Sequence, residues 1–503
     1  MKNFINNLRF DFPSSIVVFF VALPLCLGIA LASGVPLFSG IIAGVIGGIV
    51  VGFFSGSQLG VSGPAAGLAV IVFGYINALG SYNAFLVAVI IAGILQIIMG
   101  YCRLGSIAYY FPSAVIKGML FGIGLMIIIK QIPHAIGYDN WLNSDFEEYI
   151  DRGSLINLQE TINNITPMAV IISIISLAIL IIWDNFLSKK HKIFKLLQGP
   201  LVVVVFGILM SNLFDLADHQ IVAIPVANNF HEFIGNFNLP DFETLRNPQI
   251  YVMAIVLALV ASIETLLCVE ATDKLDPQKR ITPANRELKA QGIGNLISGL
   301  IGGLPITQVI VRSSANISFG AKSKNSTIFH GILLLICAIF IPNILNMIPY
   351  ASLACILLLV GFKLSHPKVF YKVFKQGFDQ FVPFFATIIG MLIFDLLKGV
   401  IIGMLVSIIF ILVNNFKNAF EKISDSHKKN THIITLAQEV TFLNKGKILQ
   451  LLKSFPDGSE VIIDGSNSKS IDFDVYEILK DYEITAKSKN IKLSLKGITI
   501  NKI

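Results

Sequence analysis

Long apolar stretches separated by short polar segments run from near the N-terminus to about Phe416. Between Phe12 and Cys102 the sequence contains no Asp, Glu, Lys or Arg. Because a helix needs about 20 mostly apolar residues to cross a bilayer, the pattern predicts about fourteen spans, several of them too short to cross alone as straight helices. The predicted spans are Ser14–Ser33, Leu37–Phe54, Ser62–Asn77, Ala84–Tyr101, Ser113–Ile132, Met168–Trp183, Leu201–Phe214, Tyr251–Val269, Leu288–Ile301, Thr307–Phe319, Thr327–Ile341, Ala351–Gly361, Phe381–Leu396 and Val400–Phe416.

The amino-acid composition independently supports a membrane protein. Apolar residues make up 54% of the chain and charged residues 14%, whereas an average soluble protein carries about 25% charged residues. A fold with so little charge must face lipid over much of its surface, so we expect a polytopic protein of the bilayer. The five cysteines have no paired spacing, which predicts neither a disulfide framework nor a zinc site.

Basic residues collect in alternate loops. Positive charge concentrates in cytoplasmic loops, so a cytoplasmic N-terminus predicts that every second loop is basic. The basic loops hold Lys189, Lys190, Lys192 and Lys195; Lys274, Lys279, Arg280, Arg286 and Lys289; Lys322 and Lys324; and Lys363, Lys368, Lys372 and Lys375. The two long opposite loops hold Asp139, Asp145, Glu147, Glu148 and Asp151, then Asp215, Asp218, Glu232, Asp241 and Glu243. We therefore expect both termini on the cytoplasmic side of the cytoplasmic (inner) membrane.

A soluble tail follows the last span, because the composition becomes mixed polar and charged after Asn414. Its β-branched content and periodicity predict two kinds of element. Strands are expected at Glu439–Leu443, Glu460–Asp464 and Ile491–Leu495, and helices at Lys447–Phe455 and Val475–Lys487. The sequence thus predicts a transmembrane domain over residues 1–420 and a small cytoplasmic α/β domain over residues 430–503.

An internal repeat relates the two halves of the membrane domain. A shift of about 247 residues places Ala43–Gly47 over Ala290–Gly294 and Gly52 over Gly299. Transporters are often built from inverted repeats. Seven predicted spans separate the copies, so the second copy would enter the membrane inverted, although Gly/Ala-rich helices also match by chance. We interpret the pattern as an all-α membrane fold with an inverted repeat of seven plus seven spans.

Each copy then reaches a proline next to glycine, at Ser62-Gly63-Pro64 and at Gly303-Leu304-Pro305. Proline suits the first turn of a helix, so each site indicates an extended segment followed by a half-helix inside the membrane. The free amides and the dipole at such a helix start attract an anion. A kink for packing alone is the other interpretation. The pattern favours a small-anion site between two half-helix starts, at Ala65-Ala66 and at Ile306-Thr307.

Several motifs carry a resemblance to a known family. Val61–Gly67, Asn285–Leu288 with Gln291–Asn295, and Arg312-Ser313 with Asn316 resemble the SulP family of inorganic anion permeases from about Asp11 to Phe416. The tail resembles a STAS domain, with Val461–Asp464 as a core strand. The resemblance implies a uracil-permease-like fold with a mobile core and a gate domain that exchange access by an elevator-like motion. It also implies sulfate, bicarbonate or chloride as substrate, and frequently a homodimer.

Two charged residues are candidates for the chemistry. Arg312, six residues into the second expected half-helix, matches the family arginine that lends positive charge to the anion. With Ala65, Ala66, Ile306, Thr307 and Gln308 it completes the expected substrate-binding set. Glu264 is the only acid between Tyr251 and Val269 and is the candidate coupling residue, for H+ or for Na+. In the alternative interpretation, Arg312 and Glu264 neutralise each other for packing. His134, after Pro133, is interpreted as an interfacial residue.

The sequence also excludes several functions. It contains no P-loop, no zinc-type Cys/His cluster and no nucleophile motif, so we expect neither an enzyme nor an ATP-driven pump, and no cofactor, metal or nucleic-acid partner. Secondary active transport of sulfate or bicarbonate remains the leading hypothesis. An uncoupled anion exchanger or channel is the alternative.

Overall fold

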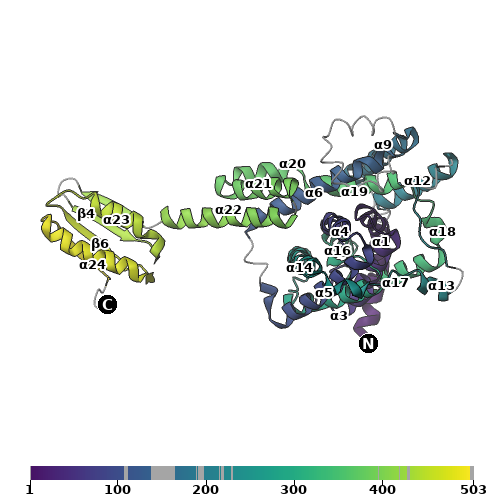
Figure 1. Cartoon of the computed structure of the whole chain (residues 1–503), viewed down its shortest axis with the longest axis horizontal. Helices are drawn as coiled ribbons and strands as arrows, with labels where there is room; N and C mark the ends of the chain where they lie inside the picture. Colours follow the sequence, from purple (N-terminus) through teal and green to yellow (C-terminus); the bar gives the residue numbers. More distant parts are fainter. Residues whose placement is uncertain are drawn as a thin grey trace. The chain divides into compact units, whose positions relative to one another are not determined.

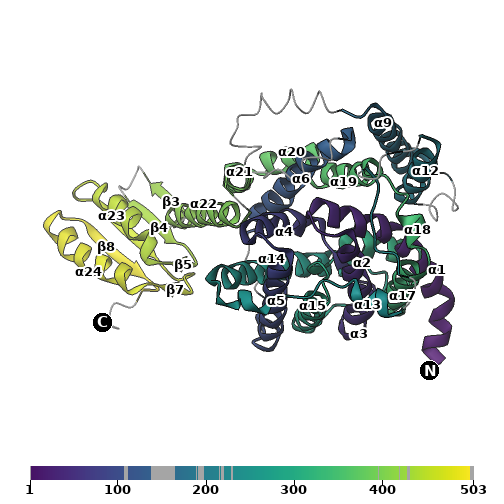
Figure 2. The ribbon, with the colours of Figure 1, turned by 45° about the vertical axis from the view of Figure 1, so that its right-hand side comes forward.

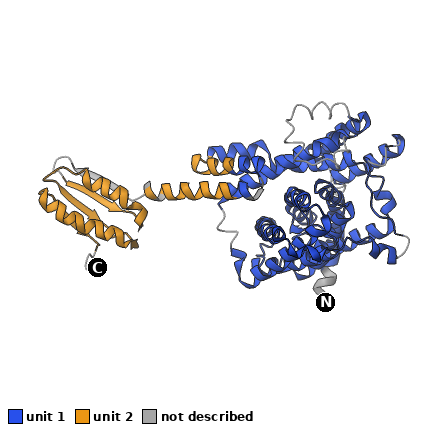
Figure 3. Cartoon of the chain, in the orientation of Figure 1, with its two compact units in different colours: residues 1–375, 387–400 blue, residues 376–386, 401–503 orange. Residues whose placement is uncertain are grey.

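The computed structural model describes most of the 503-residue chain. The described residues are 2–106, 112–137, 165–187, 190, 198–214, 216, 220–227, 230–394, 396–417, 420–426 and 431–498. They form two compact units, residues 1–375 with 387–400 and residues 376–386 with 401–503 (Figure 3). Most of the acidic residues predicted for the outer loops lie outside the described residues. The same holds for three lysines of the first basic loop, Lys189, Lys192 and Lys195.

Nearly all of the described chain before the tail is helical (Figure 1). The first half contains α1 (Lys2–Ala32), α2 (Leu37–Ile46), η1 (Gly47–Val51), α3 (Gly52–Phe54), α4 (Ala66–Leu79), α5 (Tyr82–Tyr101), α6 (Ser113–Ile136), α9 (Pro167–Ile182), η4 (Trp183–Leu187), α12 (Gly199–Phe214), α13 (Phe230–Gly235) and η6 (Phe242–Arg246). The second half contains α14 (Pro248–Leu275), α15 (Ala284–Leu300), α16 (Ile310–Ser318), α17 (Asn325–Phe340), α18 (Pro342–Leu345), α19 (Tyr350–Leu364), α20 (Pro367–Lys375), α21 (Phe378–Ile393) and α22 (Leu396–Lys417).

Helix length and hydropathy support a polytopic membrane fold. In the described part of the chain, seven helices are long and apolar enough to cross a membrane by themselves, and five more apolar helices are shorter. Each range predicted as a span coincides with a helix, or with a short strand and the helix after it. The count of fourteen spans stays a prediction, because several of these helices are too short to cross alone.

The helices of the first unit form two groups (Figures 1 and 2). One group contains α1 to α5 and α14 to α17, in which α5 packs on α14 and α15 and α1 packs on α2 and α17. The other contains α6, α9, α12 and α19. We call them the core bundle and the gate bundle. They meet where α4 packs on α6 and where α1 packs on α12 and α19.

Glycines of the predicted repeat allow the closest packing in the core bundle. A Cβ atom on Gly292 of α15 would lie 2.6 Å from the Gly93 carbonyl oxygen of α5, and one on Gly299 would lie 3.0 Å from the Leu86 carbonyl oxygen. Small residues let membrane helices approach until their backbones touch. The glycine pattern therefore reflects the α5–α15 interface in addition to any repeat.

The tail of the second unit is an α/β module. Its sheet has the order β3 (Phe420–Ser426), β4 (Thr431–Leu436), β6 (Glu460–Asp464) and β8 (Lys492–Lys496). β3 is antiparallel to β4, and the other neighbours are parallel. α23 (Lys445–Lys453) and α24 (Phe473–Ser488) bury the sheet face that carries Ile434 and Val461 (Figure 2).

Two predictions about the tail are corrected. The strand predicted at Glu439–Leu443 is only β5 (Glu439–Val440), paired with β7 (Ser470–Ile471), because Thr441 and Asn444 form a capping box that starts a 3₁₀ turn. β3 and the central strand β4 were not predicted from the sequence. β4 has a clear inside face only once β6 and the two helices cover Ile434 and Leu436.

Candidate anion-binding site

Two short strands join the two proline motifs in the middle of the core bundle. β1 (Ser62–Pro64) pairs antiparallel with β2 (Ile306–Gln308), with Ser62 opposite Gln308 and Pro64 opposite Ile306. α4 begins directly after β1, with Ala65 as its N-cap, and α16 begins after β2, with Val309 as its N-cap. Because the pairing is antiparallel, the two helices start from opposite ends of the ladder.

The start of the second half-helix is corrected by the structure. It was expected at Ile306-Thr307, but these residues form β2, and α16 begins at Ile310. Asn295 explains the extended backbone, because its side chain accepts from the Ile306 amide at 2.6 Å and donates to the Ile306 carbonyl at 3.1 Å. The counterpart of Ala65-Ala66 is therefore Val309-Ile310, and Arg312 is the third residue of its helix.

A polar network in the core bundle fixes both strands. Gln291 donates to the Ser62 hydroxyl at 2.7 Å, and the Val61 amide donates to the Ser313 hydroxyl at 3.0 Å. Asn295 is held in turn by Gln96 at 2.7 Å. Buried polar groups that are paired in this way hold one backbone geometry. Gln291 and Asn295 carry part of the family resemblance, but this structural role was not predicted, although their spacing of four residues places them on one face of a helix.

One face of α14 presents polar side chains to both helix starts. A Cβ on Gly67, in the first turn of α4, would lie 2.7 Å from Glu264 Oε1. Cys268, one turn further along α14, lies against the Ile310 amide at the start of α16. Between them, Thr265 Oγ1 accepts from the Gln308 amide at 3.3 Å. Glu264 and Cys268 therefore each face one half-helix start.

Exposure distinguishes this region from the strands beside it. Residues of β1 and β2 are buried, whereas the residues around the helix starts keep some exposure. The partly exposed residues are Ala66, Glu264, Cys268, Val309 and Ile310. The first amides of a helix lack partners within the helix, and its dipole makes this end positive. Two positive helix ends thus converge on one partly exposed face of α14.

Arg312 occupies the other side of β1. Its side chain is fully buried, Nη2 donates to Cys26 Sγ at 3.4 Å, and a Cβ on Gly63 would lie 2.1 Å from Nη1. In the described structure Arg312 makes no ion pair with Glu264, since Arg312 Nε and Nη1 and Glu264 Oε2 have no hydrogen-bond partner. The guanidinium therefore adds positive potential from behind the strand.

The remaining predicted residues have less direct positions. Gln308 turns away from the helix starts, because its Nε2 donates to Thr272 Oγ1 at 3.0 Å. Thr307 Oγ1 is buried without a partner, and Ile306 packs in the core. Gly303 and Leu304 precede the ladder, and Ser298 Oγ donates to the Leu304 carbonyl at 2.7 Å. The structure thus groups Ala65, Ala66 and Glu264 closely and places the others around them.

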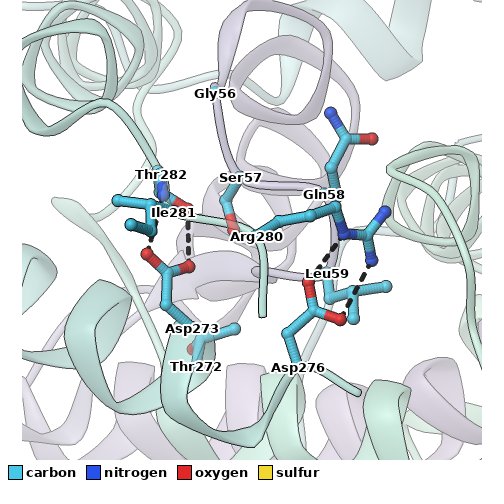
Figure 4. Close-up of a pocket in the computed structure, with 10 residues that line it drawn as sticks. All are labelled: Gly56, Ser57, Gln58, Leu59, Thr272, Asp273, Asp276, Arg280, Ile281 and Thr282. Atoms are coloured by element: carbon cyan, nitrogen blue, oxygen red, sulfur yellow. Dashed lines mark hydrogen bonds and ion pairs between the residues drawn. The ribbon is translucent and has the colours of Figure 1, made fainter. Parts of the chain in front are cut away.

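A separate pocket of about 170 Å³ lies at the end of α14 (Figure 4). Arg280 donates to both carboxylate oxygens of Asp276, and Thr282 donates twice to Asp273. Partial desolvation raises the pKa of Asp276, but hydrogen bonds from Arg280 and the Gln278 amide, with the Arg280 charge, outweigh it, so the net pKa lies below its ordinary value. Two engaged carboxylates make this pocket a poor anion site.

Comparison with known proteins agrees with this architecture. YvdB of Bacillus subtilis (strain 168), whose name assigns it to sulfate transport, is 27% identical over 431 residues, covering 85% of this chain and 77% of that protein. The solved transmembrane domain of a cyanobacterial bicarbonate transporter, BicA, has a TM-score of 0.64 at 24% identity and covers 81% of this chain and 96% of its own. The murine Slc26a9 anion transporter has a TM-score of 0.78 at 16% identity, covering 97% of this chain and 85% of its own.

The family assignment rests on a broader match. The profile of the Sulfate permease family matches residues 8–387, well over half of the chain. The strand-containing tail is consistent with the STAS domain that the motifs resemble. This protein therefore belongs to the Sulfate permease family of membrane anion transporters, and its relatives are transporters rather than enzymes.

Proposed function

We propose that this chain is a secondary active transporter of a small inorganic anion, with sulfate or bicarbonate as substrate and H+ as the coupling ion. The observation that carries the proposal is the β1–β2 pairing, which brings the starts of α4 and α16 to one face of α14. The anion binds at the Ala65-Ala66 and Val309-Ile310 amides. The positive charge of Arg312, on the other side of β1, stabilises the bound anion electrostatically.

Glu264 supplies the coupling in this proposal. Its carboxyl group lies at the first turn of α4, the position that an anion would occupy. An ionised Glu264 would satisfy the positive helix end itself and repel the substrate, whereas protonation removes that charge. Anion and proton therefore bind together. Sodium remains the competing coupling ion, and an uncoupled exchanger or channel is the competing mechanism.

The two helical bundles supply the proposed motion. The binding elements β1, β2, α4, α14 and α16 all belong to the core bundle, and that bundle meets the gate bundle along α4 and α1. We propose an elevator-like movement of the core against the gate, within a uracil-permease-like inverted repeat of seven plus seven spans. We further propose a membrane domain that ends with α22 at Lys417 and a cytoplasmic domain that begins with β3 at Phe420, ten residues earlier than expected from the sequence. Cytoplasmic termini, an inner-membrane location and a homodimer complete the proposal.

Gradient-driven uptake tests the proposal. Purified protein in liposomes should accumulate radiolabelled sulfate when the outside is made acidic, without sodium. Radiolabelled bicarbonate is tested by exchange at constant pH, because acid converts it to CO2, which crosses lipid unaided. Glu264→Gln keeps the shape but cannot titrate, so it should lose pH-driven accumulation and retain anion exchange. Glu270→Gln is the matched control, because Glu270 lies on the same helix but is exposed and pairs with Lys274.

Each contrary outcome has a defined meaning. If Glu264→Gln still accumulates anion under a pH step alone, proton coupling at this residue is wrong. If the parent protein accumulates anion only under a sodium gradient, the coupling ion is sodium. Flux that dissipates gradients but never builds one identifies a channel or an uncoupled exchanger.

A further inference from the structure

Helix α6 carries a buried polar cluster that the proposed site does not use. Lys130 is 5% exposed, Gln131 is fully buried and His134 is 1% exposed. His134 packs against the Tyr350 ring of α19 with the two rings roughly perpendicular, and its position at the membrane interface stays a prediction. A charged side chain inside a membrane protein is costly, so its presence there indicates a function by default.

The cluster lies at the contact between the two bundles. The Lys130 Nζ atom sits 3.7 Å from the ring centroid of Phe73, which belongs to α4 of the core bundle. Gly34, in the turn between α1 and α2, packs on the same ring, since a Cβ there would lie 2.8 Å from Phe73 Cδ2. Lys130 therefore contacts the very helix whose start receives the proposed anion.

Position along α4 separates this cluster from the binding site. Glu264 faces Gly67 and Lys130 faces Phe73, six residues further along. At 1.5 Å per residue this separation is about 9 Å along the helix axis. With the N-terminus cytoplasmic, as proposed above, the α1–α2 turn is extracellular. Lys130 then lies between the site and the extracellular surface.

The surroundings of Lys130 suit an anion. Gln131, next to it, has neither its amide nitrogen nor its amide oxygen hydrogen-bonded, although buried polar groups are normally paired. The described helices α4, α9, α19 and α20, which pack on α6, carry no Asp or Glu. α21 also touches α6, through Met391 beside Gly122, and its acid Asp379 accepts from Asn414 Nδ2 at 2.7 Å. α1 also touches α6, and its acid Asp11 accepts from the Lys322 and Ser323 amides instead. No free acidic residue on these helices would therefore repel an anion that approaches Lys130 and Gln131.

We propose that Lys130 and Gln131 of α6 form an anion subsite on the extracellular side of the transport site, closed here by Phe73 of α4. Displacement of the core bundle along the gate bundle moves Phe73 away, and the ammonium and amide groups then receive the anion on its way to α4. The inference rests on the proposed function for its direction, and it assigns the gate bundle a share in substrate recognition.

The subsite is tested by measuring the apparent KM for the anion separately from each side of the membrane. For Lys130→Met, the apparent KM for external radiolabelled sulfate or bicarbonate should rise about tenfold, the factor that corresponds to about 1.4 kcal/mol. The KM from the cytoplasmic side, measured in inside-out vesicles, should be unchanged, and Lys130→Arg should retain most of the external affinity. Lys117→Met on the same helix is the control. Equal changes on both sides, or a change in maximal rate alone, would overturn the proposal.

A second measurement does not need Lys130 to be replaced. Gln131→Cys should react with an externally added, membrane-impermeant methanethiosulfonate beyond the parent protein's background, and saturating sulfate or bicarbonate should slow the reaction. No reaction, or no protection by either anion, contradicts the subsite. If the parent protein transports neither anion, the proposed function fails, but protection of the introduced thiol still decides the subsite by itself.

Discussion

At the residue scale, the site depends on two glycines whose missing side chains leave room for charged groups. Gly63 lacks a side chain because the Arg312 guanidinium fills the space beside it, with Nη1 only 2.1 Å from where a Cβ would be. Gly67 similarly leaves room for the Glu264 carboxyl group, at 2.7 Å. Two glycines on consecutive elements thus accommodate one cation and one acid on opposite sides of the same backbone.

Gly63→Ala should therefore weaken anion binding without unfolding the protein. The added methyl group would displace the guanidinium from behind β1, so we expect the apparent KM to rise by about tenfold, the range of one charge-assisted interaction. Gly74→Ala is the matched control, because no atom lies within 4 Å of a Cβ on Gly74 of α4. Uptake kinetics in both variants decide this, and a wild-type KM in Gly63→Ala would show that Arg312 does not act on the anion.

At the element scale, a ladder of three residue pairs holds two helices in place. Isolated two-stranded ladders are marginal, so the stability of this one must come from its surroundings. The side chains of Asn295 and Gln291 on α15 supply it, together with Ser313 on α16. The half-helices are consequently positioned by α15, a helix that contributes no residue to the proposed anion site.

Asn295→Ala should test that dependence. It leaves the Ile306 amide and carbonyl buried without their side-chain partner, at a cost of about 1–3 kcal/mol for each unsatisfied group. We expect a clear decrease in melting temperature together with loss of uptake, whereas Ser314→Ala on α16 should change neither. Normal uptake by a normally stable Asn295→Ala protein would mean that the ladder is maintained in another way.

At the scale of the whole molecule, the proposed anion site and the α/β tail belong to different units. All proposed binding residues belong to the first unit, and the strand-containing tail belongs to the second. The tail has its own hydrophobic core, built around Val461, Val475 and Leu479. A module with an independent core can change the amount or the rate of a transporter without entering its binding site.

Removal of the tail should therefore change quantity more than selectivity. The deletion belongs after Lys417, because a cut at His432 would sever β4, the strand between β3 and β6. We expect lower assembly or maximal rate, with an unchanged ratio of sulfate to bicarbonate uptake. Val461→Asp, which disrupts the tail core in the full chain, should reproduce the effect. A shifted anion ratio in either protein would contradict the separation.

The sequence by itself determined the membrane class, the helical segments and the two proline motifs, because hydropathy and proline act locally along the chain. It also identified Glu264 as the only acid between Tyr251 and Val269, and Gly63 and Gly303 as special backbone positions. Tertiary structure decided that Ile306–Gln308 is extended, since its partner strand β1 lies more than 240 residues away and the Asn295 side chain reaches it from the neighbouring helix α15. It likewise decided that Arg312 lies behind β1, and that Lys130, unremarked in the sequence, contacts Phe73 of α4. Such choices depend on hydrogen bonds and excluded volume between different elements, some of them more than 200 residues apart, as Ser62 and Gln291 are. No local pattern encodes them.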